Sequence, residues 1–461
     1  MVCSAGRGNT MVEGLLLIGI LLVAVAGIVL ATARLKLHPF LALIAAAFFV
    51  GVTTGMPLPE LAVHITDGFG NMMRSIGLVI AAGTLIGVIL EKSGGALRMA
   101  EVVLRRVGES RPQLAMSITG AIASVPVFCD SGFVILSSLN KAIAKRAQVS
   151  LASMSVALAT GLYATHTLVP PTPGPIAAAG NLGVEEHLGL VILIGLVVAI
   201  PTIAVGYLWA MRVAIAVPTS TETEPLDHEA ITVHFGKLPS TAASFAPIVV
   251  PILLIGLGSV IAFTGYTGFG HELGRFLGTP VVALFVGLLF AFRLMPKWNE
   301  ATLSGWIADG IKAAAPILLI TGAGGAFGAV LSATKLSGLI QGLAEGGLFG
   351  GPFVLVLPFL IAAAMKTAQG SSTAALVLTS ALVAPFLAGM GIASPVQLAL
   401  VVMSIGAGAM TVSHANDSYF WVVTQFSGIA VKDAYKAFTL ATLVQGLTAF
   451  AMAFALYAVL G

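Results

Sequence analysis

Two long apolar stretches, 148–184 and 396–430, are each interrupted by polar residues and by residues that break helices. The first break runs from Thr165 to Pro175 and reads THTLVPPTPGP, and the second runs from Ser413 to Ser418 and reads SHANDS. Irregular backbone and ionisable side chains are tolerated inside a bilayer only where protein buries them or where they line a polar cavity. Two such breaks at matching places in the two halves of a chain indicate the substrate site of a transporter.

The composition indicates a membrane protein. Apolar residues make up 58% of the chain and charged residues 9%, whereas a soluble domain carries roughly a quarter charged residues. The formal net charge of +3 is too small to indicate a nucleic-acid partner. The two cysteines, Cys3 and Cys129, have neither disulfide nor metal-ligand spacing. We therefore predict an all-α polytopic membrane protein that uses no metal or other cofactor.

Further apolar runs have the length of about 17–25 residues that one crossing of a bilayer requires. They lie near 14–33, 39–56, 74–91, 187–211, 243–264, 277–293, 311–331 and 436–459. No small-residue cleavage site follows the first run, so we expect a retained helix rather than a signal peptide, with Met1 or Met11 as the start. Together with the two interrupted stretches, these runs predict about ten transmembrane helices, two of them broken.

Two more apolar stretches, 113–141 and 351–388, carry a polar turn in the middle. The turns are FCDSG at 128–132 and KTAQGSST at 366–373. Most of the arms are short for a full crossing, so we predict two re-entrant hairpins whose tips stop inside the membrane. Two ordinary helices joined by a loop are the alternative.

The order of these elements repeats along the chain. Asp67 and Asp309 each begin a DG-hydrophobic motif that we expect to open a helix, and a hairpin and a broken helix follow in both halves. Placing Arg34 and Lys36 in the cytoplasm puts 16 of the 22 basic residues on that side. The two copies then start on opposite faces, which predicts an inverted repeat. We expect an N-terminal half at 1–217, a cytoplasmic linker at 218–242 and a C-terminal half at 243–461, each half with a scaffold and a transport repeat.

Small and polar residues gather at the hairpin tips and at the breaks. Small residues let the backbone approach a ligand, and the start of a tip helix favours an anion. The alternative is that these residues only pack helices together. The candidate substrate-binding residues are Ser131, Gly132, His166, Thr167, Gln369, Gly370, Ser371, Ser372, Thr373, His414 and Asn416.

Ionisable groups in the tips and breaks are candidates for carrying a proton. A carboxyl group buried in a bilayer or an imidazole can exchange a proton near neutral pH, so we select Asp130, Asp417 and His166. Asp417 also has the position of a helix N-cap, and the two roles are compatible. Lys366 either pairs with a substrate carboxylate or snorkels from deeper in its arm.

These motifs together resemble the gluconate permease (GntP) family. The resemblance covers essentially the whole chain. It is carried by PVFCDSGF at 126–133, the two breaks, AQGSST at 368–373, HPFLAL at 38–43 and GAGGAF at 322–327.

The resemblance implies an elevator-type symporter, usually a homodimer, in the bacterial inner membrane. Such proteins import gluconate and related sugar acids, D-glycerate or D-serine. Family members with Glu-Val-Gly at the first tip differ from this chain, which has Asp130-Ser131-Gly132. The shorter acid and added hydroxyl favour a smaller substrate such as glycerate.

The leading expectation is proton-coupled uptake of small hydroxylated carboxylates. Coupling to Na⁺ and transport of D-serine are alternatives, because backbone carbonyls at helix breaks also suit Na⁺. A passive anion channel would need a continuous pore, which two opposed dead-end hairpins do not favour. The sequence contains neither HExxH nor GxSxG, so we expect no enzymatic activity.

Overall fold

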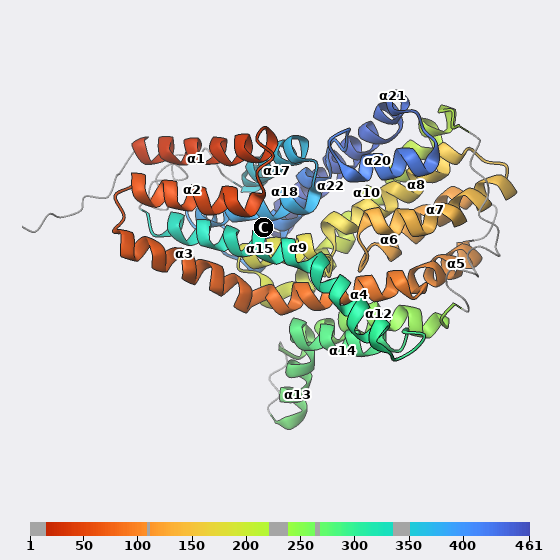
Figure 1. Cartoon of the computed structure of the whole chain (residues 1–461), viewed down its shortest axis with the longest axis horizontal. Helices are drawn as coiled ribbons and strands as arrows, with labels where there is room; N and C mark the ends of the chain where they lie inside the picture. The colour runs from red at the N-terminus through yellow and green to blue at the C-terminus, as the bar shows by residue number, and fades with distance from the viewer. Residues whose placement is uncertain (1–14, 108–110, 221–237, 263–267, 335–350) are drawn as a thin grey trace, which may run out of the picture.

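The computed structural model describes residues 15–107, 111–220, 238–262, 268–334 and 351–461 (Figure 1). Within these ranges the chain is helical, and its one β-type contact is an isolated bridge between Thr219 and Ile429. The described helices of the first half are α1 (Leu15–Ala33), α2 (Pro39–Thr53), α3 (Leu58–Met72), α4 (Leu78–Lys92), α5 (Gly95–Val107), α6 (Pro112–Ala123), α7 (Cys129–Arg146), α8 (Leu151–Leu168), α9 (Pro173–Asn181) and α10 (Leu188–Arg212).

The second half is helical as well in the part of the chain that the structure describes. Its helices are α12 (Thr241–Ala262), α13 (Phe269–Gly278), α14 (Pro280–Phe292), α15 (Ile307–Ser332), α17 (Val356–Gln369), α18 (Ser372–Leu387), α19 (Pro395–Met410), α20 (Ser418–Ser427), α21 (Val431–Ala434) and α22 (Leu440–Leu460). The prediction of an all-α membrane protein is therefore confirmed.

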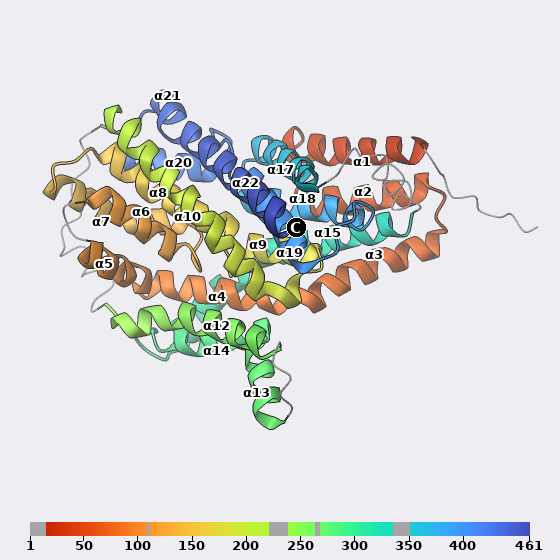
Figure 2. The same ribbon diagram turned by 180° about the vertical axis from the view of Figure 1, so that it is seen from behind.

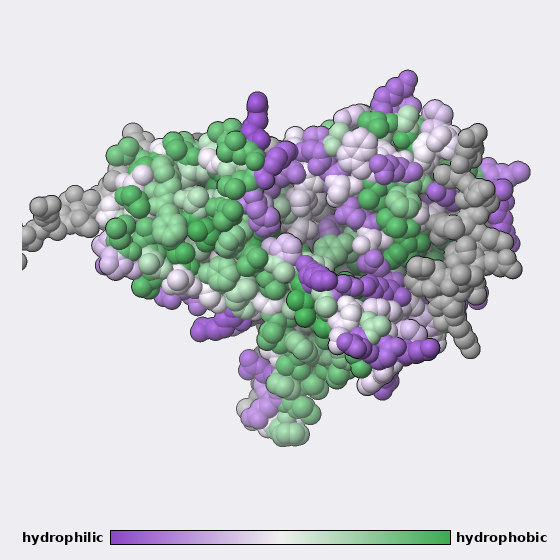
Figure 3. All heavy atoms as spheres, viewed as in Figure 1, coloured by the Kyte–Doolittle hydropathy of each residue, from purple (hydrophilic) through white to green (hydrophobic). Residues whose placement is uncertain are grey.

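Among the described residues, six helical segments are long and apolar enough to cross a membrane. They are 58–92, 185–216, 241–258, 301–332, 351–369 and 431–460. A seventh results if α13 and α14, which are bent by 73° at their junction, form one span. The predicted number of about ten includes the broken and shorter helices and stays a prediction. Apolar side chains such as Leu16, Leu30 and Phe48 cover the outer face of the first helices, where lipid would contact them (Figure 3).

The helices α3 and α4 join through a π-helical turn at Met73–Gly77 into one helix of 35 residues. The expectation that Asp67 opens a helix is therefore wrong. Pro57 and Pro59 set the start at Leu58, since proline favours the first helical turn, and Asp67 is exposed on the helix surface. Likewise, Asp309 lies after a π-helical turn at Ala301–Trp306 that already begins the second long helix.

The two long helices run antiparallel to each other. Gly68 lies against Gly325 and Ala329, while Gly310 lies against Leu85, so the start of each helix meets the end of the other. A Cβ atom at Gly68 would approach the Gly325 carbonyl oxygen to 2.5 Å, so the backbones touch directly. Helices that are equivalent in sequence order and opposite in direction are what an inverted repeat requires.

The helix pairs predicted as hairpins lie where the sequence placed them. The pair α6 and α7, here called hairpin 1, is joined by residues 124–128, and the pair α17 and α18, here called hairpin 2, by Gly370 and Ser371. The first break, residues 169–172, separates α8 from α9, and the second break, residues 411–417, separates α19 from α20. The depth of the hairpin tips in a bilayer stays a prediction.

The broken helices lie at the centre of the fold. All residues at 152–168 of α8 and at 399–410 of α19 are buried, as expected for helices that are apolar on every side. The helices α10 and α22 lie side by side over them (Figure 2). The first break is thereby fully buried, whereas the second break is exposed at Asn416. The buried polar groups of each break must find partners inside the protein.

Candidate functional site

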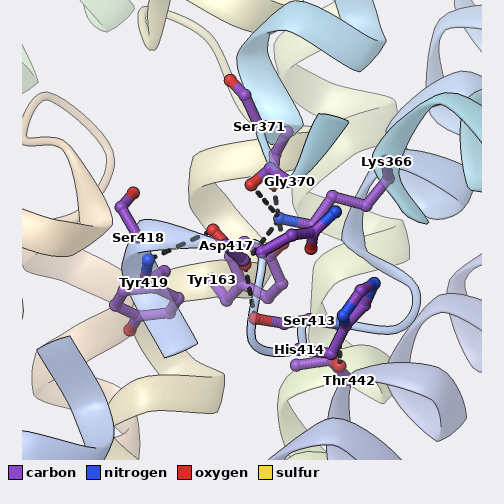
Figure 4. A network of polar contacts seen from close by, with 12 residues as sticks. Tyr163, Lys366, Gly370, Ser371, Ser413, His414, Asp417, Ser418, Tyr419 and Thr442 are labelled. Carbon is purple, nitrogen blue, oxygen red and sulfur yellow. Dashed lines mark hydrogen bonds and ion pairs between the residues drawn. The ribbon is translucent and has the colours of Figure 1, made fainter. Parts of the chain in front are cut away.

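The tip of hairpin 2 and the second break meet beside α8 in a cluster that we call the polar junction (Figure 4). Hairpin 1 reaches this cluster through Asp130. At its centre is Lys366, in the last turn of α17. Its ammonium nitrogen lies 2.6 Å from the Asp417 Oδ2 atom and 3.0 Å from the Gly370 carbonyl oxygen. The side chains of Lys366 and Asp417 are 0% and 4% exposed. Lys366 therefore neither snorkels nor stands free for a substrate, which corrects both readings of its role.

Asp417 joins three partners around one carboxylate. It is the N-cap of α20, and its Oδ1 atom accepts a hydrogen bond from the Tyr419 backbone N–H at 3.1 Å. Its Oδ2 atom accepts from the Ser413 hydroxyl as well as from Lys366. A buried carboxylate is stable only when it is paired and hydrogen-bonded. Lys366 of hairpin 2 supplies the pairing, while Ser413 and the Tyr419 N–H supply the hydrogen bonds.

Gly370 allows hairpin 2 to approach the second break closely. It ends α17 in the left-handed region with φ of +79°, which glycine adopts without strain. A Cβ atom there would lie 2.1 Å from the Asn416 carbonyl oxygen. The side chains of His414 and Asn416 both contact the Thr367 carbonyl oxygen, at 3.2 Å and 2.7 Å. Hairpin 2 and the second break are thus joined through backbone as well as side chains.

The helix α8 contributes an aromatic wall to the junction. The Lys366 ammonium group lies 5.5 Å from the centre of the Tyr163 ring, within the range of a cation–π interaction. The Tyr163 hydroxyl forms a 2.6 Å hydrogen bond with the Ser372 hydroxyl at the start of α18. The Tyr419 hydroxyl donates to the Ala159 carbonyl oxygen at 2.9 Å, which ties α20 to α8.

Hairpin 1 contributes Asp130, in the first turn of α7. The carboxylate is half-buried and accepts a 3.4 Å hydrogen bond from the Ser418 hydroxyl. Among the described residues, Asp130 has no cation within ion-pair distance. The junction therefore holds two carboxylates and one ammonium group, and Asp130 is the carboxylate without a charged partner.

Two neighbours of Asp130 point away from the junction. The Ser131 side chain lies within hydrogen-bonding reach of Glu91 on α4. A Cβ atom at Gly132 would lie 2.7 Å from Leu162, so Gly132 allows α7 to pack against α8. These contacts favour the packing role over ligand contact for both residues.

The last turn of α8, just before the first break, contributes His166, which is 4% exposed and lies against the Phe128 ring at 5.9 Å between ring centres. Its Nδ1 atom has no hydrogen-bond partner among the described residues. Thr167 is fully buried, and its hydroxyl donates to the Tyr163 carbonyl oxygen. Pro173 begins α9, as proline commonly does at a helix start.

The remaining candidates at hairpin 2 differ in position. Ser371 is exposed, caps α18, and accepts from the Ala374 N–H at 3.2 Å. The Gln369 side-chain amide donates to Thr32 on α1, away from the second break. Thr373 lies one residue further into α18, beside Gly174 of α9. The structure therefore brings Asp130, Gly370, Ser371, Ser372, His414, Asn416 and Asp417 to the junction and leaves the others at its rim or in helix contacts.

The sequence analysis missed Tyr163, Ser418 and Tyr419. Tyr163 precedes His166 by three residues on the same helix, so the helical repeat alone places both on one face. An apolar cavity of about 450 Å³ lies elsewhere, between the end of α9, α15 and α18. We locate the candidate site at the polar junction because the buried ionisable groups gather there.

Comparisons with known proteins place this arrangement in a family. The model of GntP family permeases matches residues 15–460. A gluconate permease of Pseudomonas aeruginosa is 32% identical over 424 residues, which cover 91% of this chain and 92% of that protein. The D-serine transporter DsdX of Escherichia coli K12 is 31% identical over 442 residues, which cover 95% and 97% of the two chains.

A solved structure has a similar fold. The YdaH transporter of Alcanivorax borkumensis aligns with a TM-score of 0.62 at 15% identity, over 87% of this chain and 88% of that one. The matching proteins are permeases and transporters rather than enzymes. With its long apolar helices, the chain is a multi-pass protein of the inner membrane. Since the family model covers nearly all of its length, the chain belongs to the GntP permease family.

Proposed function

We propose that the chain imports small hydroxylated carboxylates together with protons. The observation that carries this proposal is the polar junction, where two hairpin tips and a helix break bring buried charges together inside an apolar protein. Gluconate and related sugar acids are the main substrate class, and D-glycerate is the smaller candidate. A relative named as a gluconate permease supports this class.

The substrate carboxylate would bind at the start of α18. The first N–H groups of a helix lack partners within it and favour an anion. Ser371, Asn416 and Ser418 have exposed side chains around this position, and their hydroxyl and amide groups can pair with substrate hydroxyls. His414 lies beside them, half-buried. This division of roles requires a ligand that has both a negative charge and hydroxyl groups.

Asp130 would carry the coupled proton. Asp417 is neutralised by Lys366 at 2.6 Å, whereas Asp130 has no described cation partner. A substrate anion next to a bare carboxylate raises the electrostatic energy, and protonation of Asp130 removes that repulsion. Binding of the anion and uptake of the proton thereby favour each other. Asp417 and His166 are the alternative carriers, and for Asp417 a proton would have to disrupt the ion pair.

The inverted repeat and an elevator-type movement belong to the same proposal. The antiparallel course of the two long helices supports the repeat. The junction joins hairpin 2 to the second break in one unit, which suits a transport domain that moves as a body. A homodimer is expected from the family resemblance, and the mass of the detergent-solubilised protein tests it.

Import of D-serine is the second candidate. A relative is named as a D-serine transporter, and an unpaired Asp130 carboxylate could hold the ammonium group of an amino acid. This reading predicts that Asp130→Asn abolishes D-serine binding. The proton reading predicts that Asp130→Asn still binds gluconate.

Binding measurements on purified protein test the substrate class. We would titrate gluconate, D-glycerate, D-serine and deoxy analogues of the acids. A deoxy acid leaves a polar group of the binding site without its hydrogen-bond partner, which costs roughly 1–3 kcal/mol of binding free energy. We therefore expect deoxy acids to bind about tenfold weaker or worse. Equal affinity for deoxy acids, or a preference for uncharged sugars, would contradict the proposal.

A matched pair of variants tests the location of the site. Ser371 and Ser394 are both exposed N-cap serines whose hydroxyls accept a backbone N–H at 3.2 Å. Only Ser371 lies at the junction. We expect Ser371→Ala to weaken gluconate binding and Ser394→Ala to leave it unchanged. An equal effect of both changes would move the site elsewhere.

A further inference from the structure

We propose that the Lys366 ammonium group occupies a monovalent-cation site between hairpin 2 and the second break. Because this cation is covalently attached to the chain, no Na⁺ ion from solution has to bind there. This inference rests on the proposed function only in placing the substrate at the same junction. It goes beyond that function because it assigns a role to the buried pair that substrate binding does not use.

The surroundings of the nitrogen are those of a cation site. One ligand is the Gly370 carbonyl oxygen at the C-terminal end of α17, and another is the Asp417 carboxylate. Carbonyls at helix C-terminal ends beside an unwound segment are typical ligands of Na⁺ in transporters. The Tyr163 ring covers a further side, and the Lys366 side chain is 0% exposed.

The positive charge of Lys366 is accordingly neutralised within the protein, by Asp417. With no exposed surface, the ammonium group cannot contact a substrate without leaving Asp417 unpaired in a buried place. Removing one partner of a buried ion pair is strongly destabilising. The pair thus acts as a fixed clamp that holds the tip of hairpin 2 on the second break.

The corresponding place in the first half has no such pair. There the residue at the N-cap of α9 is Thr172 instead of an acid, and its hydroxyl donates to the Val169 carbonyl oxygen at 2.7 Å. A neutral side chain at this position needs no cation. The Lys366 ammonium group therefore lies at the break that carries a carboxylate. Without this lysine, a free cation would be required there to neutralise Asp417.

Truncation of the lysine should convert the clamp into a site for a free ion. Lys366→Ala removes the stem and the charge, and leaves the oxygens of Gly370, Asp417 and Ser413 around the vacated volume. Oxygen ligands of this kind suit a hard cation. Lys366→Met removes the charge but fills the stem volume, so it is the matched control. Lys366→Ala combined with Asp417→Asn removes the anionic ligand.

The test measures thermal unfolding of purified protein in NaCl and in choline chloride at equal concentration. We expect the wild type to unfold at the same temperature in both salts. We expect Lys366→Ala to be stabilised by Na⁺ alone, by about 2 °C when Na⁺ is tenfold above its Kd. Lys366→Met and the double variant should show no preference for Na⁺.

Each remaining result has a defined meaning. If Lys366→Ala can be purified in NaCl but not in choline chloride, the proposal holds in its strongest form. If the variant responds equally to both salts, or cannot be purified in either, a free cation does not replace the ammonium group and the proposal is overturned. A Na⁺-specific shift of the wild type also overturns it. Failure of the wild type to bind any hydroxy acid would refute the proposed function and leave this result intact.

Discussion

The buried pair of Lys366 and Asp417 gives the sharpest prediction about stability. Asp417→Asn retains a side-chain oxygen that can cap α20, since Asn and Asp are about equal at this position. It removes the negative charge 2.6 Å from an ammonium group that is 0% exposed. Breaking a buried ion pair in this way loses about 3–5 kcal/mol. We expect the unfolding midpoint of the purified protein to fall by roughly 3–5 °C.

The pair of Lys92 and Asp309 is the control. It also joins distant parts of the chain, but its side chains are 34% and 44% exposed, so water solvates either charge when the other is removed. Exposed pairs contribute little to stability, and we expect Asp309→Asn to shift the midpoint only slightly. If Asp417→Asn destabilises the protein no more than Asp309→Asn does, the charge at the junction is solvated and the account of the clamp is wrong.

Three further variants test single contacts. Gly370→Ala should abolish substrate binding and destabilise the protein, because its Cβ atom would meet the Asn416 carbonyl oxygen. Gly391→Ala is the control: this glycine has a similar φ of +74° and open space around it, so the change should only add backbone strain of about 1 kcal/mol. Equal unfolding midpoints of the two variants would contradict this. Asp130→Asn in proteoliposomes should still bind and exchange gluconate but should not accumulate it against a pH gradient, so normal accumulation would remove Asp130 from coupling. Tyr163→Phe keeps the ring beside the ammonium group and loses one buried hydrogen bond, so we expect a loss of about 1 kcal/mol in chemical unfolding; an unchanged value would show that water replaces the hydroxyl.

Local sequence signals predicted the breaks and the hairpin turns well. Pro173 and Gly370 have strong backbone preferences that act within a few residues: α9 begins at Pro173, and α17 ends immediately before Gly370. The N-cap role of Asp417 followed from the same kind of signal. The start of the first long helix was missed because the motif at Asp67 was taken as the start, although Pro57 and Pro59 were the stronger signal.

The contacts within the junction could not be predicted from such local signals. Lys366 and Asp417 are 51 positions apart, and Tyr163 and Ser372 are 209 positions apart. No periodic pattern encodes a pairing across that distance. The sequence therefore identified which residues are unusual in a membrane, whereas the fold decided that Lys366 is paired and that Ser131 and Gly132 face neighbouring helices.

The direct backbone contact between the two long helices makes them sensitive to a single methyl group. Gly68 and Leu85 are 17 residues apart, so the contacts at these two positions lie about 25 Å apart along the helix. A Cβ atom at Gly68 would have to push the Gly325 carbonyl oxygen, 2.5 Å away, outward by about 1 Å to reach ordinary contact distance. If the contact between Leu85 and Gly310 stays in place, that displacement rotates one helix against the other by roughly 2°. At Gly77, where the nearest atom is 3.8 Å away, the same methyl group fits without any rotation.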